Sequence, residues 1–276
     1  MNYNEQKKIL LRQAIEELQP EIDAAKRSFG SIKETPLMKS LEIVLQELGP
    51  LPREALFLGI AGDGLPVLLN MHDPNPGPLL LISDPGAGKT AFLRICGKAL
   101  IEMHPPQEAQ FAVITNHVDE WEDFTANNQT NCIGVFPAYH DSAVDLISSL
   151  SAWAQRNRTP NQSIILMIDD INCIDKMDFD IKQTFRWLLS RAPTRRLWPL
   201  VTMTASDSFE MESWLPAFRT RIYGKIDDCP TALYSFHHGR EPLESLNHMS
   251  FSKLHSGVQF ALREGNDLLR FWIPEQ

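Results

Sequence analysis

Residues 79–98 read LLLISDPGAGKTAFLRICGK, and this stretch decides the fold. The apolar run 79–82 predicts a buried strand, and residues 91–103 predict an amphipathic helix. Between them lies a glycine-containing turn that ends in Gly-Lys-Thr at residues 88–90. A strand, such a turn and a helix in this order form the context that a phosphate-binding loop (P-loop) requires.

The turn has the residues that phosphate binding needs. Gly86 and Gly88 let the backbone curl so that successive N–H groups point into one concavity, and the helix adds the positive end of its dipole. Lys89 would reach the β- and γ-phosphates, and the Thr90 hydroxyl would ligate Mg²⁺. The residues expected to bind the nucleotide are Asp84, Pro85, Gly86, Ala87, Gly88, Lys89, Thr90 and Ala91.

Ser83 departs from the pattern G-x-x-x-x-G-K-[ST], which has glycine at this position. Serine tolerates an unusual exit from a strand less freely than glycine does, but the N–H donors come from the residues that follow. The alternative is a chance Gly-Lys-Thr in a loop rich in glycine and proline. The flanking strand and helix favour the nucleotide site.

Residues 163–170, SIILMIDD, predict a second buried strand that ends in two acids. Asp169, at the carboxyl end of this strand, can bind Mg²⁺ or its water close to Thr90. Asp170 lies where a carboxylate could polarise the attacking water, although it is one methylene shorter than glutamate. The alternative is an ordinary strand followed by a polar turn.

Other residues could complete a catalytic site. Thr202 or Thr204, at the end of an expected strand over 198–204, could sense the γ-phosphate or orient the water; each could equally be a half-buried strand threonine. An arginine could stabilise the transition state. A dense basic cluster consists of Arg186, Arg191, Arg195 and Arg196. It is either a solvated helix end, a charge supplied to a neighbouring subunit or a contact for a polyanion. The candidates for such an arginine finger, the arginine that stabilises the transition state, are Arg191, Arg195, Arg196, Arg219 and Arg221. Of these, Arg221 is assigned the catalytic role.

The rest of the chain predicts an N-terminal helical arm over 1–49, before a P-loop domain over 50–276. Within the arm, a helical seam over 9–29 is either packed on the main domain or part of a coiled coil, and a second helix runs from Thr35-Pro36 to Gly49-Pro50. Further helices are expected over 141–157 and 179–190. Further strands are expected over 56–60, 65–70, 110–116, 132–136, 222–226, 258–262 and 268–273.

Two polar segments are interpreted as ordinary structural features without a functional role. The acidic run 119–123 is typical of a solvated helix face and not of a cation site. His237-His238 has no partner at metal-ligand spacing and predicts a surface or packed pair.

Composition limits the function classes. The 276 residues include 26 basic and 35 acidic ones, a formal charge of −9 that argues against a surface coated by nucleic acid, though not against a local basic groove. Four cysteines without C-x-x-C spacing predict reduced thiols and no zinc site. The sequence has neither an apolar signal core nor a run long enough to cross a membrane, so we expect a cytoplasmic protein.

From about residue 57 to 274 the chain resembles the FtsK/HerA-type group of P-loop ATPases. The resemblance rests on a glycine-containing hairpin over 59–67, the P-loop, the strand ending Ile168-Asp169-Asp170, and the segments 188–191, 201–204 and 221–222. It implies an α/β, RecA-like P-loop NTPase fold with a mostly parallel central sheet, helices on both faces, a strand between the two nucleotide motifs and a C-terminal β-hairpin. It also implies ATP hydrolysis with Mg²⁺ and ring assembly that applies force to DNA or protein.

The leading functional hypothesis is Mg-dependent ATP binding and hydrolysis by an FtsK-like ATPase that works as an oligomeric motor on DNA or protein. The alternative is an ATP-dependent regulatory switch with slow hydrolysis that controls a partner protein; a structural adaptor with a relic site is a third. Ser83, Asp170, the acidic charge, and the lack of an anchor and of a separate DNA-reading domain count against a full motor.

Overall fold

The computed structural model describes residues 39–126, 130–157, 162–228, 230, 251–264 and 267–275. The predicted helix over 9–29, His237-His238 and the turn 265–266 lie outside these residues. Residues from Lys39 onward form one unit. None of the described helices combines the length and the apolar run needed to span a membrane.

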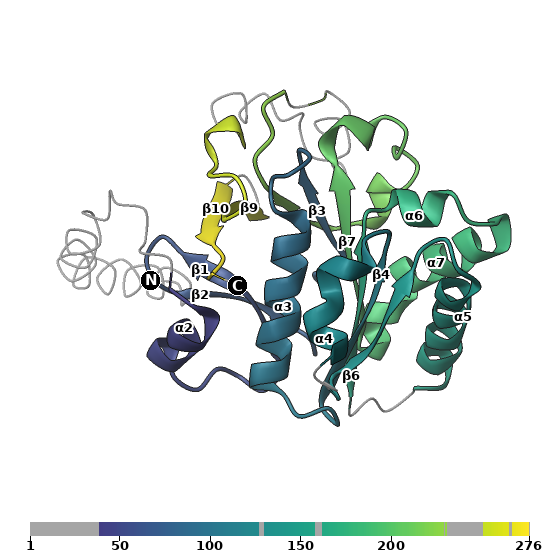
Figure 1. Ribbon diagram of the computed structural model, residues 1–276, viewed down its shortest axis with the longest axis horizontal. Coiled ribbons are helices and arrows are strands. Elements are labelled where there is room, and N and C mark those ends of the chain that lie inside the picture. The colour runs from purple at the N-terminus through teal and green to yellow at the C-terminus, as the bar shows by residue number, and fades with distance from the viewer. Residues whose placement is uncertain are drawn as a thin grey trace, which may run out of the picture. The chain divides into compact units, whose positions relative to one another are not determined.

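In the described part of the chain, ten strands form a single sheet (Figure 1). They are β1 Ala55–Ala61, β2 Pro66–Asn70, β3 Leu79–Ser83, β4 Ala109–Thr115, β5 Cys132–Pro137, β6 Ser163–Asp169, β7 Leu197–Thr204, β8 Thr220–Tyr223, β9 Gln259–Glu264 and β10 Asp267–Trp272. Their order across the sheet is β2-β1-β10-β9-β8-β3-β7-β6-β4-β5. The six strands from β8 to β5 pair in parallel, whereas β2, β1, β10 and β9 pair antiparallel.

The order of the parallel strands confirms the predicted RecA-like core. Strand β7 lies between β3, which leads into the P-loop, and β6, which ends in Asp169. Because parallel strands end at the same edge, the loops after β3, β6 and β7 come together at the carboxyl edge of the sheet. This is the edge at which ligands bind in open α/β folds.

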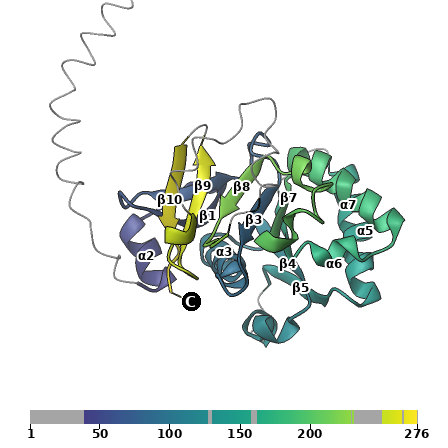
Figure 2. The same ribbon diagram turned by 90° about the horizontal axis from the view of Figure 1, so that it is seen from above.

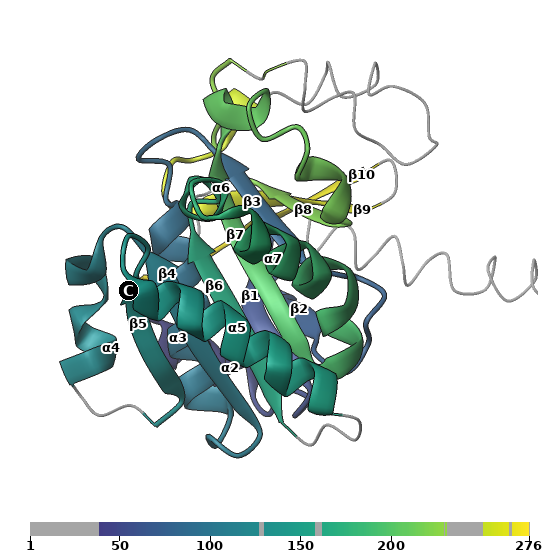
Figure 3. The same ribbon diagram turned by 90° about the vertical axis from the view of Figure 1, so that its right-hand side faces the viewer.

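Helices cover both faces of the parallel strands, as Figure 2 shows from above. The helices are α2 Leu41–Leu48, α3 Lys89–Met103, α4 Glu122–Ala126, α5 Asp141–Arg156, α6 Asn172–Asp175 and α7 Phe179–Arg191. Helices α5 and α7 lie over one face (Figure 3), and α3 lies over the other. Among the short 3₁₀ helices, η1 Val118–Trp121 and η3 Ala205–Ser208 follow the ends of β4 and β7, and η4 Leu215–Ala217 precedes β8.

Strand β3 shows why an unbroken apolar run forms this fold. Successive side chains of a strand point to opposite faces, so Leu80 and Ile82 join the core with α5 and α7. Leu79 and Leu81 join the core with α3. All four are buried, as expected for a parallel strand covered on both sides.

Two predicted boundaries are wrong. Strand β8 begins at Thr220, two residues before the predicted 222–226, because the polar Thr220 and Arg221 conceal its first half. Helix α2 begins at Leu41 and not at residue 36, because Lys39 and Ser40 are not helical and Ser40 forms a bridge with Glu275. The remaining predicted strands and helices of the described part are present, with ends shifted by one or two residues.

Candidate active site

The loop after β3 has the backbone of a phosphate cradle. Gly86 and Gly88 have φ angles of 70° and 92°, in the left-handed region that side chains other than glycine rarely adopt. Helix α3 begins directly after the loop, at Lys89. The first N–H groups of a helix have no partner within it, so they and the loop amides can bind an anion.

Ser83 fits the site without the flexibility of glycine. It is the last residue of β3, pairs in register with Thr204 and is fully buried. On its other side Ser83 faces Gly224. A Cβ atom at residue 224 would lie 2.8 Å from the Ser83 Cβ, so the glycine leaves the room that the serine side chain needs. Ser83 is thus a strand residue, and the phosphate-facing turn begins after it.

Asp169 lies beside Thr90, although 79 residues separate them. The Thr90 hydroxyl donates a hydrogen bond to Asp169 Oδ2 at 3.0 Å, and Thr115 Oγ1 lies 3.4 Å from the same oxygen. The Asp169 side chain is only 8% exposed. Burial raises the pKa of this carboxyl group, while the hydrogen bond from Thr90 acts in the opposite direction.

The pair Thr90 and Asp169 fits Mg²⁺. A hydroxyl and a carboxylate are oxygen ligands, the kind that Mg²⁺ prefers, and Mg²⁺ keeps several waters or phosphate oxygens as further ligands. In the described ranges, no group of three or more His, Cys, Asp or Glu side chains is arranged to hold a metal. A site with one hydroxyl and one carboxylate would suit an ion that arrives with a nucleotide.

Asp170 has a strained backbone that several hydrogen bonds hold in place. Its φ angle is 87°, a left-handed value that costs a non-glycine residue roughly 1 kcal/mol or more. Its N–H donates to Thr202 Oγ1 at 2.8 Å. Its Oδ1 accepts from the backbone N–H and the side-chain amide of Asn172 at 2.9 and 3.0 Å. Strain supported in this way is common at functional sites.

The two strand threonines of β7 have different positions. Thr202 is buried, and its hydroxyl lies 3.4 Å from Asp169 Oδ1 in addition to accepting from the Asp170 N–H. It therefore orients both acids. Thr204 is half-buried and pairs with Ser83, directly before the P-loop. Its role near a γ-phosphate stays a prediction.

Lys89 is surrounded by acids. Its ammonium group donates to the carbonyl oxygen of Asp84 at 3.3 Å. Burial lowers the pKa of Lys89, and the charges of Asp170, Asp169, Asp207 and Asp84 oppose this shift. Asp207, in η3, also accepts a hydrogen bond from the Asn172 amide at 2.7 Å. Sequence reasoning missed Asn172 and Asp207, because polar residues after a strand carry no local signal of what they contact.

A segment far along the chain covers part of the P-loop. The Gly257 N–H donates to the carbonyl oxygen of Ala87 at 3.2 Å, and Ser256 Oγ lies 3.5 Å from that of Gly86. A Cβ atom at Gly88 would lie 2.6 Å from the Gly257 Cα, so the two glycines are in direct backbone contact. Nothing in the sequence pattern predicts this contact.

The structure does not bring the finger candidates to this loop. Arg221 pairs in register with Leu80, about 10 Å along the strand before the loop at 3.3 Å per residue. Its side chain is 6% exposed and donates to the carbonyl oxygen of Leu215 at 2.8 Å. The assignment of Arg221 as a finger is therefore corrected: it is a buried structural residue.

The other four candidates lie toward the opposite, amino edge of the sheet. Arg191, Arg195 and Arg196 precede β7, and Arg219 precedes β8.

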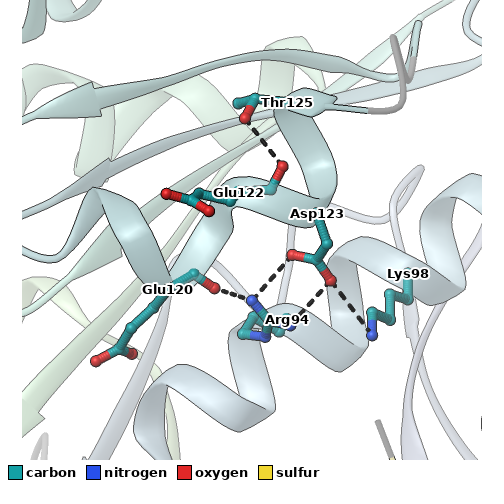
Figure 4. Close-up of polar contacts among 6 residues, drawn as sticks. All are labelled: Arg94, Lys98, Glu120, Glu122, Asp123 and Thr125. Carbon is teal, nitrogen blue, oxygen red and sulfur yellow. Dashed lines mark hydrogen bonds and ion pairs between the residues drawn. The ribbon is translucent and has the colours of Figure 1, made fainter.

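The acidic run 119–123 is more than a solvated face. Arg94, one helical turn after Thr90, donates to both carboxylate oxygens of Asp123 at 3.0 and 2.9 Å (Figure 4). Burial alone would raise the pKa of Asp123, but the hydrogen bonds and charge of Arg94 lower it overall. Trp121 is fully buried. The prediction of a solvated run is thus wrong for these two residues.

Comparison with known proteins gives a fold. No protein-family model and no curated protein matches the sequence. The structure is similar to EccC (ATPases 2 and 3) of Thermomonospora curvata, with a TM-score of 0.62 and 15% identity over 89% of this chain and 44% of that one. It is also similar to EssC (ATPases 2 and 3) of Geobacillus thermodenitrificans, with a TM-score of 0.63 and 13% identity over 95% and 50%.

A third solved structure, described as an ATPase, has a TM-score of 0.63 and 16% identity over 88% of this chain and 97% of its own. This chain spans about half the length of the EccC and EssC structures. At these identities the likeness establishes the fold, and it confirms the predicted resemblance to FtsK/HerA-type ATPases at that level.

Proposed function

We propose that this chain binds ATP with Mg²⁺ and hydrolyses it. The observation that carries the proposal is the 3.0 Å hydrogen bond between Thr90 and Asp169 beside a loop with two left-handed glycines. If the P-loop motif had arisen by chance, there would be no reason for an acidic strand end to lie beside it. The fold shared with the EccC and EssC ATPases supports the same conclusion.

Each residue of the site has a chemical task. Lys89 and the amides of residues 84–89 bind the phosphates, and Thr90 with Asp169 would hold Mg²⁺. When bound, Mg²⁺ neutralises charge on the phosphate oxygens. Asp170 orients the attacking water, and Thr204 lies where the γ-phosphate is expected. Thr202 positions the two acids by its hydrogen bonds.

The described part of the chain places none of the candidate arginine fingers at the P-loop, and this favours assembly with a second molecule. Four of these arginines lie toward the amino edge. A second copy or a partner could supply one of them. We therefore propose an oligomeric motor. Because the EccC structure is a complex with a signal sequence peptide and this chain carries a charge of −9, protein is a better candidate substrate than DNA.

A regulatory switch is the second candidate function. The observation that favours it is the short Asp170 side chain, one of whose oxygens is already occupied by Asn172. Such a site would bind ATP and turn it over slowly while the bound state controls a partner.

ATP turnover by the full chain tests the proposal. Phosphate release should require Mg²⁺ and stop when EDTA removes it, and Mg·ATP should raise the melting temperature. Size should be determined in the same buffer, with and without nucleotide and duplex DNA. Assembly on ATP with stimulated turnover indicates a motor, and slow unstimulated turnover indicates a switch. Absence of any ATP-dependent thermal shift would refute the nucleotide site.

A further inference from the structure

A cavity of about 530 Å³ adjoins the first turn of α3, next to the proposed Mg²⁺ site. It is lined by Thr90, Ala91, Arg94, Asp119, Glu120, Glu122 and Asp123. The acidic members belong to the segment that follows β4. Because β4 pairs with β6 and Thr115 is in register with Asp169, this segment leaves the sheet directly beside the Asp169 carboxylate.

Arg94 fixes the backbone of this segment to the helix that carries Thr90. Its guanidinium donates to both oxygens of Asp123 and also to the main-chain carbonyl of Glu120 (Figure 4). Lys98 adds an ion pair to Asp123 at 3.5 Å. Thr90 and Arg94 are four residues apart, on the same face of α3. The position of Glu120 is therefore tied to the position of the Thr90 hydroxyl.

The contacts of Arg94 with Asp123 and with the Glu120 carbonyl form a clamp, and the Glu120 carboxylate takes no part in it. Figure 4 shows that it points away from the Arg94 guanidinium. No other described residue hydrogen-bonds or ion-pairs with it. It lines the same cavity as Thr90, whose hydroxyl hydrogen-bonds to Asp169. A carboxylate that has no partner among the described residues and shares a cavity with Thr90 is suited to proton transfer.

We propose that Glu120 is the proton acceptor in ATP hydrolysis and that Arg94 is its positioning residue. This inference rests on the proposed ATPase function. The water oxygen forms a bond to the γ-phosphorus, and the bond from this phosphorus to the β,γ-bridging oxygen breaks. Glu120 takes one water proton and later releases it to solvent, and the products are ADP and inorganic phosphate. Asp170, whose Oδ1 is bound by Asn172, orients the water.

The test compares Glu120→Gln with Glu122→Gln in the full chain. Both side chains are exposed and line the same cavity, so each variant removes one negative charge from it. Loss of the proton acceptor should lower phosphate release about 100-fold or more, while the thermal shift with Mg·ATP is kept. Glu122→Gln should stay close to the wild type in both assays. Glu120→Asp should restore part of the turnover.

Turnover of Glu120→Gln within about threefold of the wild type would overturn the inference, since a general base is worth at least a hundredfold. A wild-type chain that binds Mg·ATP without hydrolysing it would overturn it too, and would leave the nucleotide site standing. A chain that binds no ATP would overturn the proposed function itself. The two failures are thus distinguishable.

A double-mutant cycle tests the role of Arg94. Arg94→Gln should lower turnover about tenfold and keep the ATP-dependent thermal shift, and the double variant with Glu120→Gln should be no slower than Glu120→Gln alone. Arg94→Gln should lower the kcat of hydrolysis and leave the KM for ATP close to that of the wild type. Losses that add fully in the double variant would show that Arg94 acts independently of Glu120.

Discussion

The two edges of the parallel strands differ in chemistry. At the carboxyl edge, Thr90, Asp169, Asp170 and Thr202 come from three strand ends and are joined by hydrogen bonds of 2.8 to 3.4 Å. At the amino edge lie Arg191, Arg195, Arg196 and Arg219, which come before β7 and β8. One edge is a preorganised site of acids with one lysine, Lys89, and the other carries the arginines that are candidates for the finger. The difference supports the proposal that a second molecule supplies an arginine to the site.

The largest expected effect belongs to Lys89 at the carboxyl edge. Lys89→Ala should lower turnover about 1000-fold, because it removes the ammonium group that is expected to stabilise the transferring phosphate. It should also abolish most of the ATP-dependent thermal shift. Lys39→Ala, which removes an exposed lysine paired with Glu47, is the matched control and should change neither. Full turnover and an unchanged shift in Lys89→Ala would remove the P-loop from the mechanism.

Asp170→Asn should have the next largest effect, a loss of about 100-fold in turnover with ATP binding intact. Asparagine keeps an oxygen that can accept from Asn172, so the local geometry should survive. Asp180→Asn, an exposed aspartate in the first turn of α7, is the control for the change of charge. Hydrolysis retained by Asp170→Asn would assign the orientation of water elsewhere.

Threonine-to-valine substitutions compare the two edges directly. Thr202→Val leaves the Asp170 N–H without its side-chain acceptor and should cost about 1–3 kcal/mol of stability. It should also lower turnover about tenfold, since the acids lose their alignment. Thr220→Val, at the amino edge, removes a 2.7 Å hydrogen bond to the Pro76 carbonyl and should affect stability alone. Urea unfolding and phosphate release separate the two effects; equal turnover in both variants would remove the distinction between the edges.

The smallest effect on ATP binding is expected at the amino edge. The double variant Arg191→Ala with Arg195→Ala should keep the ATP-dependent thermal shift of the wild type, because these residues lie away from the P-loop of their own chain. Turnover that falls only under conditions of assembly would show that the charge is supplied between copies. Turnover equal to the wild type would favour the switch.

Local patterns were enough to predict most of the fold. The apolar runs before Gly86 and Asp169 predicted two parallel strands and their loops, and hydrophobic periodicity predicted α3, α5 and α7. Thr220 and Arg221 defeated the same reasoning, because a buried arginine in a strand looks polar in sequence. The start of α2 was also missed, since Ser40 is held by Glu275 at the other end of the chain.

The site was predicted only as far as its motifs extend. The proximity of Thr90 and Asp169 follows from strand order, which the resemblance implied. The clamp between Arg94 and Asp123, and the support that Asn172 gives to Asp170, depend on contacts between loops. Such contacts are set by the three-dimensional arrangement of strand ends and leave no periodic signal in the sequence.

The contact of Gly88 with Gly257 links the nucleotide loop to β9 and β10 through main-chain atoms alone. Since linkage is reciprocal, a ligand that shifts Gly88 would also change the energy of the hairpin formed by these strands, and a contact that holds the hairpin would change the affinity for that ligand by the same factor. A side chain at residue 88 would break this contact, because its Cβ atom would lie 2.6 Å from the Gly257 Cα.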